Sequence, residues 1–305
     1  MKVSVVIPTY NRKLILQKCL FSLENQRLHS LITDYEIIVV DDGSTDGTYQ
    51  WIKDNEAKLP HVVLLEQQHG GPAAGRNLGV INSQNEIIVF IDSDLIVVED
   101  FLFHHVSKLC EYWKINNKKC FTYGSVINTS NFSNPKEEKY KITDISFAYF
   151  ATGNVAISKD LLLKAGLFDT SFSLYGWEDL ELGERLKNFN TKLIKCPEAI
   201  GYHWHPPFNY EQIPSLVKKE SERAKMAMIF FNKHRNTRVR MIIQFTILHK
   251  IFWEIVCLGG LINTQTLLPI LKILIKFGKN NFALELLRLS LNHIYVNELY
   301  KLSRN

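Results

Sequence analysis

The stretch "IIVFIDSDLIVV", residues 87–98, decides the fold. An unbroken apolar run ends in Asp92-Ser93-Asp94, and the chain then turns apolar again. A run without polar alternation is typical of a strand buried on both faces, as in a parallel sheet covered by helices. Two carboxylates one residue apart require a cation, a hydrogen-bond donor or open water beside them. We therefore expect a ligand at the carboxyl end of this strand.

Three similar runs precede this strand and alternate with helical segments. They are "KVSVVIP" (2–8), "YEIIVVDD" (35–42) and "HVVLLEQ" (61–67), all rich in β-branched residues. The segments between them show helical spacing or the Ser, Thr, Asp and Gly-Pro signals that begin a helix. This alternation predicts an α/β fold with a doubly wound, mostly parallel central sheet.

The pattern changes after Asp94. We expect helices over 101–116 and from 176, a strand over 120–127, a strand, turn and helix within 148–169, and a last strand within 191–207. Beyond Pro214 the sequence is helical and apolar, with interspersed cations. We predict an α/β domain over residues 1–214, followed by a helical C-terminal region over residues 215–305.

The two regions differ in charge. The net charge of the 305 residues is +5, but residues 215–305 carry 15 Lys and Arg against 5 Asp and Glu. A basic and apolar helical segment suits an anionic membrane surface, and it equally suits a subdomain that packs on the first domain or on another subunit. It is too apolar to follow nucleic acid. His249, Lys250 and Glu254 interrupt the best candidate for a membrane-spanning helix.

Cysteines and the N-terminal residues indicate the compartment. The five cysteines are scattered and form no C-x-x-C pair, which excludes a disulfide scaffold and a cysteine-rich zinc site. Too few apolar residues precede Pro8 to form the core of a signal peptide. We expect a cytoplasmic protein with peripheral contact at the inner face of the cytoplasmic membrane.

Polar side chains follow three of the predicted strands: Thr9 and Tyr10, then Asp42, then Asp92 and Asp94. Because the carboxyl ends of parallel strands share one edge of a sheet, these groups predict an acidic crevice. The alternative for residues 41–46 is that their acids and Ser cap the next helix. Asp92-x-Asp94 suits a hard divalent cation, Mg²⁺ or Mn²⁺.

Five segments, taken in order, resemble a known family. They are "VSVVIPTYNR" (3–12), "EIIVVDDGSTDGT" (36–48), "GGPAAGRNLGV" (70–80), "IIVFIDSD" (87–94) and "GWEDLELGERL" (176–186). They resemble the signatures of family-2 glycosyltransferases, which have the nucleotide-sugar-binding fold called GT-A. The resemblance covers roughly residues 1–207 and leaves the basic tail unexplained.

The resemblance implies roles for individual residues. The positions it assigns to the nucleotide and donor sugar are Pro8, Thr9, Tyr10, Asp42, Arg76, Asp92, Ser93, Gly153 and Asn154. Asp94 would bind the metal directly, with Asp92 facing the ribose and the cation. Asp179 would be the base of an inverting enzyme, and Glu178 would hold the acceptor. Trp177 could stack on an acceptor sugar or belong to the core. For Arg76, the alternative to a nucleotide contact is a position on the surface of a helix.

The segment "GYHWHPP" (201–207) supplies one more metal ligand by resemblance. His203 fits the position best, and His205 is the second choice. Alternation along a strand places the two rings on opposite sides, so only one should face the crevice. A nitrogen ligand favours Mn²⁺ over Mg²⁺.

These features together predict a metal-dependent glycosyltransferase in polysaccharide biosynthesis. It would transfer a hexosyl or N-acetylhexosaminyl group, with inversion, from a nucleotide-sugar, preferably a UDP-sugar, to a glycan or lipid-linked acceptor. Two alternatives remain: a nucleotidyltransferase that makes a sugar nucleotide, and a non-catalytic, membrane-associated glycan-binding protein. The first would normally need a Gly-rich triphosphate loop, and residues 8–16 contain no glycine.

Overall fold

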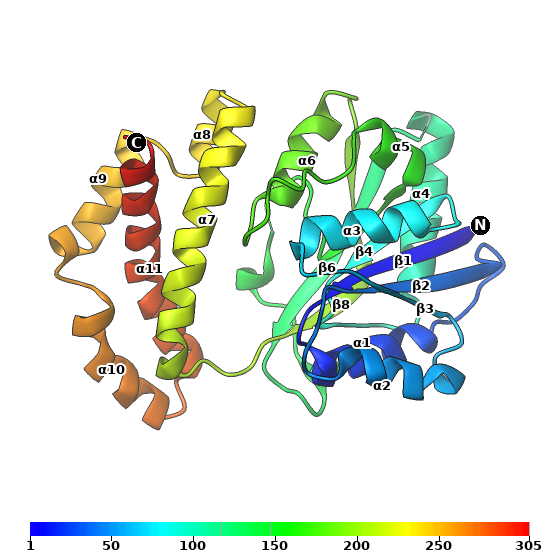
Figure 1. The fold of residues 1–305 in the computed structure, drawn as a ribbon, viewed down its shortest axis with the longest axis horizontal. Helices are drawn as coiled ribbons and strands as arrows, with labels where there is room; N and C mark the ends of the chain where they lie inside the picture. Colours follow the sequence, from blue (N-terminus) through cyan, green and yellow to red (C-terminus); the bar gives the residue numbers. More distant parts are fainter. Residues whose placement is uncertain (117, 147, 305) are drawn as a thin grey trace. The chain divides into compact units, whose positions relative to one another are not determined.

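The computed structural model describes residues 1–116, 118–146 and 148–304. The chain forms two compact units. The first comprises residues Met1–Ser173 and Glu178–His205, and the second comprises Leu174–Trp177 and the chain from Pro206 onward. The chain therefore passes between the units three times. Figure 1 shows the course of each unit.

The first unit is built on an eight-stranded sheet with the order β3-β2-β1-β4-β7-β6-β8-β5. The strands β1 to β4 pair in parallel, β6 and β8 also pair in parallel, and the β4–β7, β7–β6 and β8–β5 pairs are antiparallel. The strands are β1 (Lys2–Thr9), β2 (Asp34–Asp41), β3 (Val62–Glu66), β4 (Ile87–Ile91), β5 (Leu95–Val97), β6 (Cys120–Thr129), β7 (Asn154–Ser158) and β8 (Lys192–Trp204). The predicted α/β fold class is confirmed.

Helices cover both faces of this sheet (Figure 1). They are α1 (Lys13–Glu24), α2 (Thr48–Asp54), α3 (Gly71–Asn82), α4 (Phe101–Asn116), α5 (Lys159–Lys164) and α6 (Glu178–Lys187). Alternate residues of β4 enter two separate cores. Val89 packs with α1 and α4, whereas Phe90 packs with α3, α5 and α6. The apolar run 87–91 is thus buried on both faces, as its composition predicts.

Gly79 explains how closely α3 approaches the sheet. A Cβ atom at this position would lie 2.4 Å from Cγ1 of Val6 on β1. No side chain fits at that distance, so the glycine lets the helix sit directly on the strand. The close approach holds α3, the helix that carries Arg76, against β1.

The second unit is helical. It consists of α7 (Ile213–Lys233), α8 (Thr237–Ile242), α9 (Ile247–Val256), α10 (Thr264–Lys276) and α11 (Asn280–Leu302), and no strand occurs in it among residues 206–304. The long helices α7 and α11 pack together, and α9 and α10 pack on α11. Leu271, Leu287 and Leu291 form part of its core with Phe208. Within the described ranges, no helix combines the length and hydropathy that crossing a membrane requires.

The short segment 174–177 belongs to this helical unit. The Trp177 ring lies near Phe230 and Tyr295, with ring centroids 6.1 Å and 6.4 Å away. Its indole N–H donates to the carbonyl of Arg223 at 2.9 Å. The ring is therefore engaged with α7 and α11, which is the core alternative that the sequence left open for it.

Candidate active site

The Asp92-Ser93-Asp94 triplet forms the turn between β4 and β5. The carbonyl of Asp92 accepts a hydrogen bond from the Leu95 N–H at 3.1 Å. The side chain of Asp92 is 37% exposed, whereas that of Asp94 is only 6% exposed. The two carboxylates contact different partners. Each negative charge is therefore stabilised separately, although the two residues are only two positions apart in the sequence.

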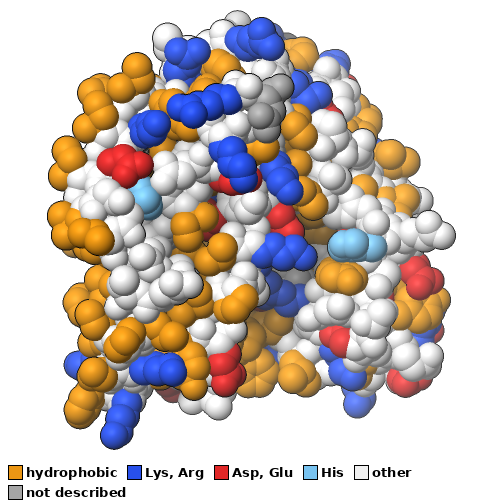
Figure 2. Space-filling view, turned by 60° about the vertical axis from the view of Figure 1, so that its left-hand side comes forward, with side chains coloured by type: hydrophobic (Ala, Val, Ile, Leu, Met, Phe, Trp, Pro, Cys, Tyr) orange, Lys and Arg blue, Asp and Glu red, His pale blue; other side chains and the backbone are white. Residues whose placement is uncertain are grey.

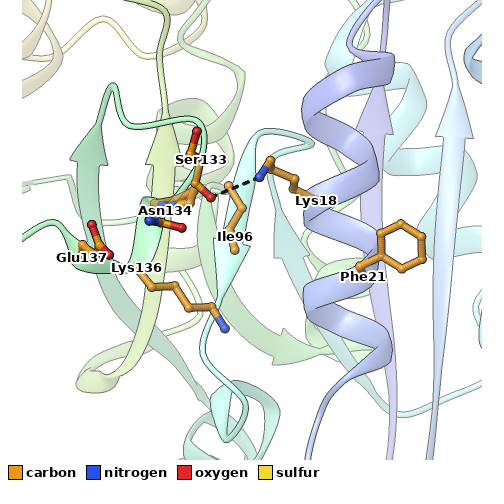
Figure 3. Close-up of a pocket in the computed structure, with 8 residues that line it drawn as sticks. Lys18, Phe21, Ile96, Ser133, Asn134, Lys136 and Glu137 are labelled. Atoms are coloured by element: carbon orange, nitrogen blue, oxygen red, sulfur yellow. Dashed lines mark hydrogen bonds between the residues drawn. The ribbon is translucent and has the colours of Figure 1, made fainter.

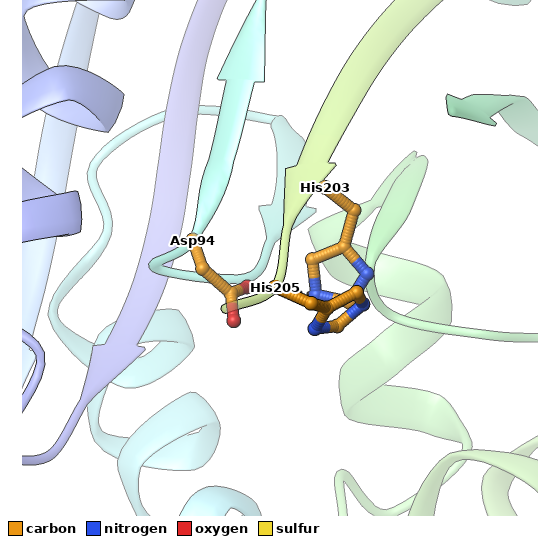
Figure 4. A group of neighbouring side chains, drawn as sticks. All are labelled: Asp94, His203 and His205. Atoms are coloured by element: carbon orange, nitrogen blue, oxygen red, sulfur yellow. Dashed lines mark ion pairs between the residues drawn. The ribbon is translucent and has the colours of Figure 1, made fainter. Parts of the chain in front are cut away.

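Asp94 lies in a cluster with His203 and His205 (Figure 4). One ligand atom from each residue can be chosen so that all three lie within 4.8 Å of one another. The Nε2 atom of His203 is 2.9 Å from Oδ1 of Asp94, and the two imidazole rings have centroids 4.0 Å apart. An oxygen and two nitrogens form a donor set that suits a transition-metal ion such as Mn²⁺.

The prediction that His203 and His205 point to opposite sides is wrong. Strand β8 ends at Trp204, so the alternation rule does not apply to His205. The backbone N–H of His205 donates to the Thr129 carbonyl at 2.9 Å, and its Nε2 lies 3.2 Å from Oδ1 of Asn128. These contacts turn its ring toward His203. Within the described residues, Asp92 does not join this metal-ligand group.

Arg12 is a member of this cluster that sequence reasoning did not single out. Its Nη1 atom lies 2.5 Å from Oδ2 of Asp94. The available signal was a cation just after the first strand, at the same sheet edge as the acids. Burial disfavours the charged form of both Asp94 and His203. The hydrogen bond and the opposite charges outweigh it, lowering the pKa of Asp94 and raising the pKa of His203.

Arg76 forms the centre of a second cluster. Its guanidinium is buried, which excludes the surface position considered for it. Its Nη1 lies 2.9 Å from Oε1 of Glu178, and its Nη2 lies 3.3 Å from Oδ1 of Asp92. Burial opposes its charge, but the neighbouring carboxylates Glu178, Asp92 and Asp179 raise the pKa of Arg76 further. Arg76 therefore joins the β4–β5 turn to the first residue of α6.

Asp179 follows Glu178 in the first turn of α6. Burial, and then the negative charge of Glu178, raise the pKa of Asp179 to about 7, although Arg76 acts in the opposite direction. The residue before the pair is held in a rare conformation, because Trp177 has φ of +78° after Gly176 at +96°. A non-glycine residue in the left-handed region costs about 1–2 kcal/mol and is frequent beside functional groups.

The predicted nucleotide positions on β1 reach the same sheet edge. Thr9 is buried, and within the described chain its Oγ1 has no hydrogen-bond partner. Tyr10 is 43% exposed and its ring stacks on His69 at a centroid distance of 4.2 Å. Pro8 contacts α3, where a Cβ on Gly75 would lie 3.2 Å from the proline Cβ. Sequence reasoning missed His69, which carries no recognisable motif.

Asp42 is occupied by the loop that precedes α3. Its Oδ1 accepts hydrogen bonds from Nε2 of Gln67 at 2.6 Å and from the Gly70 N–H at 2.8 Å, and its Oδ2 accepts from the Gly71 N–H at 3.0 Å. His69 also pairs with Oδ2 at 2.8 Å. These four partners occupy both oxygens of the carboxylate. The structure therefore does not leave Asp42 open to the nucleotide, in contrast to the prediction from the sequence.

Gly153 and Asn154 differ in their availability to a ligand. A Cβ on Gly153 would lie 3.0 Å from Oδ2 of Asp92, so the glycine lets the backbone approach that carboxylate. The Asn154 side chain is fully buried and bonds the carbonyls of Ser125 and Ala199 and the ring of His105. It is committed to the core, which speaks against a side-chain contact with the donor sugar.

A cavity on this unit lies apart from the acidic clusters (Figure 3). It has a volume of about 440 Å³ and lies between α1, β5 and the loop 133–137, with Lys18, Phe21 and Ile96 in its lining. The Nζ of Lys18 donates to the Ser133 carbonyl at 3.4 Å across it. None of the predicted site residues lines this cavity. Ser93, which the sequence placed near the donor, is buried in the β4–β5 turn.

Comparison with known proteins identifies relatives of this chain. Residues 4–164 match the model of the family described as "Glycosyl transferase family 2". The hyaluronan synthase of Pasteurella multocida is 27% identical over 241 residues, which cover 67% of this chain and 24% of the synthase. The chain thus spans about a quarter of that relative's length.

Two solved structures share the fold. A mannosyltransferase from Pyrobaculum calidifontis in complex with GDP-Man and Mn²⁺ has a TM-score of 0.56 and 19% identity, covering 78% of this chain and 66% of that chain. Residues 1–349 of Staphylococcus aureus TarS in complex with UDP-GlcNAc have a TM-score of 0.52 and 18% identity, covering 99% of this chain and 92% of that chain. The family model spans more than half of the sequence and includes Arg76 and the Asp92-x-Asp94 turn. This chain therefore belongs to glycosyl transferase family 2.

Proposed function

We propose that the protein is a metal-dependent glycosyltransferase that moves a sugar from a nucleotide-sugar donor to a hydroxyl group of a growing glycan. The observation that carries this proposal is the pairing of two clusters in one unit. Asp94, His203 and His205 could supply ligands for a cation, and Asp92 links through Arg76 to Glu178, which precedes Asp179. Glycosyl transfer needs both an electrophile for the leaving diphosphate and a base for the acceptor.

Asp94, His203 and His205 would hold Mn²⁺, with Mg²⁺ as the second choice. The bound cation would supply charge neutralisation for the departing diphosphate. Arg12 now neutralises Oδ2 of Asp94, so a cation would replace this guanidinium or share the carboxylate with it. We keep Asp92 as the donor-facing acid rather than a direct ligand, because it lies against Arg76.

Thr9 and Tyr10 are our choice for the nucleoside, together with Arg76 and Asp92. The unpaired Oγ1 of Thr9 can donate to a ligand, and the exposed Tyr10 ring offers a face for stacking on a base. Asp42 would act by shaping the loop 67–71 rather than by direct contact. UDP is the favoured nucleotide. The TarS structure holds UDP-GlcNAc and the mannosyltransferase holds GDP-Man, so relatives of this fold differ in the donor.

Asp179 is our choice for the base. Its carboxylate would take the proton of the acceptor hydroxyl as that oxygen attacks the anomeric carbon and the diphosphate leaves with the bonding electrons. One in-line displacement inverts the configuration, so an α-linked donor would give a β-linked product. Glu178 would hold the acceptor. Trp177 is less suited to stack on a sugar, because its ring packs with Phe230 and Tyr295.

The acceptor is proposed to be a glycan or a lipid-linked glycan in polysaccharide biosynthesis. The UDP-GlcNAc held by the TarS structure supports a hexosyl or N-acetylhexosaminyl group as the transferred unit. We propose that the protein works at the inner face of the cytoplasmic membrane and that catalysis belongs to the sheet unit. Of the predicted domain 1–214, the structure groups Leu174–Trp177 and residues 206–214 with the helices instead. The acid pair at Glu178-Asp179 favours catalysis over a role in glycan binding alone.

Thermal unfolding with UDP, GDP, CMP and dTDP, each with Mn²⁺ and again with EDTA, tests the proposal. A ligand at 100 times its dissociation constant stabilises by about 2.7 kcal/mol, which raises the melting temperature of a unit of this size by roughly 5–10 °C. We expect a rise with UDP that EDTA abolishes and that Asp94→Asn weakens. Asp160→Asn, at an exposed acid of α5, is the matched control. If none of the four nucleotides raises the melting temperature, the proposal is contradicted.

A further inference from the structure

The second unit exposes a large apolar surface on α9, α10 and the turn between them. Ten large side chains there are between 49% and 77% exposed. We call them the α9–α10 surface; they are Ile247, Leu248, Ile251, Phe252, Ile255, Leu258, Leu261, Ile270, Ile273 and Phe277. Exposed apolar patches of this extent are uncommon on a protein that has no partner. Figure 2 shows hydrophobic side chains gathered along its left-hand margin, with Lys and Arg side chains above and below them.

The exposed side chains form one stripe on each helix. On α9, residues 247, 248, 251, 252 and 255 fall within an arc of about 140°, at about 100° per residue. No residue of α9 is buried, and these exposed apolar residues show that its most apolar side faces outward. On α10, Ile270 and Ile273 are exposed, as is Phe277 directly after the helix, while Leu267 and Leu271 enter the core. Both helices pack on α11, so they belong to one layer of this unit.

Positive charge surrounds these stripes. Residues 235–279 contain seven Lys and Arg and a single acid, Glu254. Oε2 of Glu254 lies 3.2 Å from Nε2 of His293 on α11. Lys272, Lys276 and Lys279 are exposed on and after α10. Lysine side chains beside an apolar stripe can keep their ammonium groups in the headgroup region while their methylene groups lie along the acyl boundary.

We propose that the α9–α10 surface docks on an anionic lipid bilayer. The helices α9 and α10 would lie in the interface plane, with their exposed Ile, Leu and Phe side chains among the acyl chains. The surrounding Lys and Arg would meet anionic headgroups. A second copy of the chain fits less well, because the same face on two copies would bring two sets of the exposed Lys272, Lys276 and Lys279 together. This inference extends the proposed function and does not rest on it.

Vesicle flotation of the full chain tests the docking. The probes are vesicles of pure phosphatidylcholine and vesicles with roughly one third phosphatidylglycerol, without nucleotide or metal. We expect at least about tenfold stronger partitioning to the anionic vesicles. Removing apolar groups with Ile251→Ser and Phe252→Ser together should weaken it at least about tenfold. The matched control is Ile81→Ser with Leu163→Ser, which removes two exposed apolar side chains of the first unit.

A charge variant separates lipid docking from non-specific hydrophobic adsorption. Lys276→Glu with Lys279→Glu should remove most of the preference for phosphatidylglycerol and leave the melting temperature unchanged, because both side chains are exposed. The proposal is overturned if the wild-type chain does not float with anionic vesicles, or if Ile251→Ser/Phe252→Ser floats as well as its control. The surface would instead be assigned to self-association if the wild-type chain does not bind vesicles but is a dimer in light scattering, and if Ile251→Ser/Phe252→Ser abolishes that dimer. Nucleotide binding is measured separately, so failure here would remove the proposed membrane location but leave the proposed glycosyl transfer intact.

Discussion

At the scale of single residues, the surroundings of Asp179 determine its acid–base chemistry. Its pKa is raised to about 7 because burial and the charge of Glu178 disfavour the carboxylate. A base must be unprotonated to accept a proton, so kcat/KM should rise with pH and level off above about pH 7. The profile is measured with saturating metal and with the donor well below its KM. A profile that is flat between pH 5.5 and 8.5 would contradict this assignment.

Replacing Asp179 should separate catalysis from stability. Asp179→Asn removes the proposed base and should lower kcat by about 10²–10⁴-fold. The same change should stabilise the fold at pH 8. Below about pH 4 the wild-type carboxyl is protonated in both the folded and unfolded states; as pH rises to about 7, its raised folded pKa makes ionisation cost stability.

Thermal unfolding of Asp179→Asn and wild type at pH 8 and pH 4 measures this cost. We expect the variant to melt higher at pH 8 by on the order of 2–4 °C, with the difference disappearing at pH 4. Asp169→Asn, on the loop before Glu178, is a control outside the cluster. Full transfer activity in a folded Asp179→Asn protein would show that another group is the base.

At the level of the elements, the end of β8 determines the proposed metal site. His203 is its penultimate residue and His205 lies just beyond it, yet both rings reach Asp94. His203→Ala and His205→Ala should each weaken Mn²⁺ binding at least about tenfold, since each removes one nitrogen donor. Calorimetric titration with Mn²⁺ measures the effect, and His104→Ala on α4 is the control. A variant that binds Mn²⁺ like wild type would remove that histidine from the ligand set.

The order of the first elements could be predicted because β1, β2, β3 and β4 lie in largely apolar runs that alternate with helical segments. Residues 87–91 are such a run, and their burial on both faces follows from it. The three-residue strand β5 was not predicted, because three residues carry no period. The antiparallel pairing of β7 also needed the structure, since pairing direction depends on partners distant in sequence.

The candidate site was predictable only as far as its residue types. Acids at strand ends pointed to the correct sheet edge, but not to which donor each would meet. Arg12 on Asp94 and Glu178 on Arg76 join residues 82 and 102 positions apart. Asn154 matched a motif, yet its amide satisfies buried carbonyls. Such choices are made by tertiary contacts, which a local pattern does not contain.

At the level of the whole molecule, replacing Trp177 should lower the stability of the full chain but increase the solubility of a chain that lacks the helical C-terminal region. In the full chain, Trp177→Ser removes contacts with Phe230 and Tyr295 and should cost about 1–3 kcal/mol of unfolding free energy. In a chain ending at residue 205 those partners are missing, so the same substitution should increase solubility. Denaturant unfolding and sedimentation of the two forms measure these effects. A full-chain variant as stable as wild type would contradict the first expectation.

The three passages of the chain between the two units also bear on how family members can be recombined. Residues 174–177 belong with the helices, although they lie inside the sequence of the sheet unit. A chimaera that exchanged only the chain from Pro206 onward would set the tryptophan of one parent against the α7 and α11 of another. A workable crossover must carry residues 174–177 with the helices. The smallest exchangeable module is thus discontinuous in sequence, and its shorter piece ends at the residue immediately before Glu178 and Asp179.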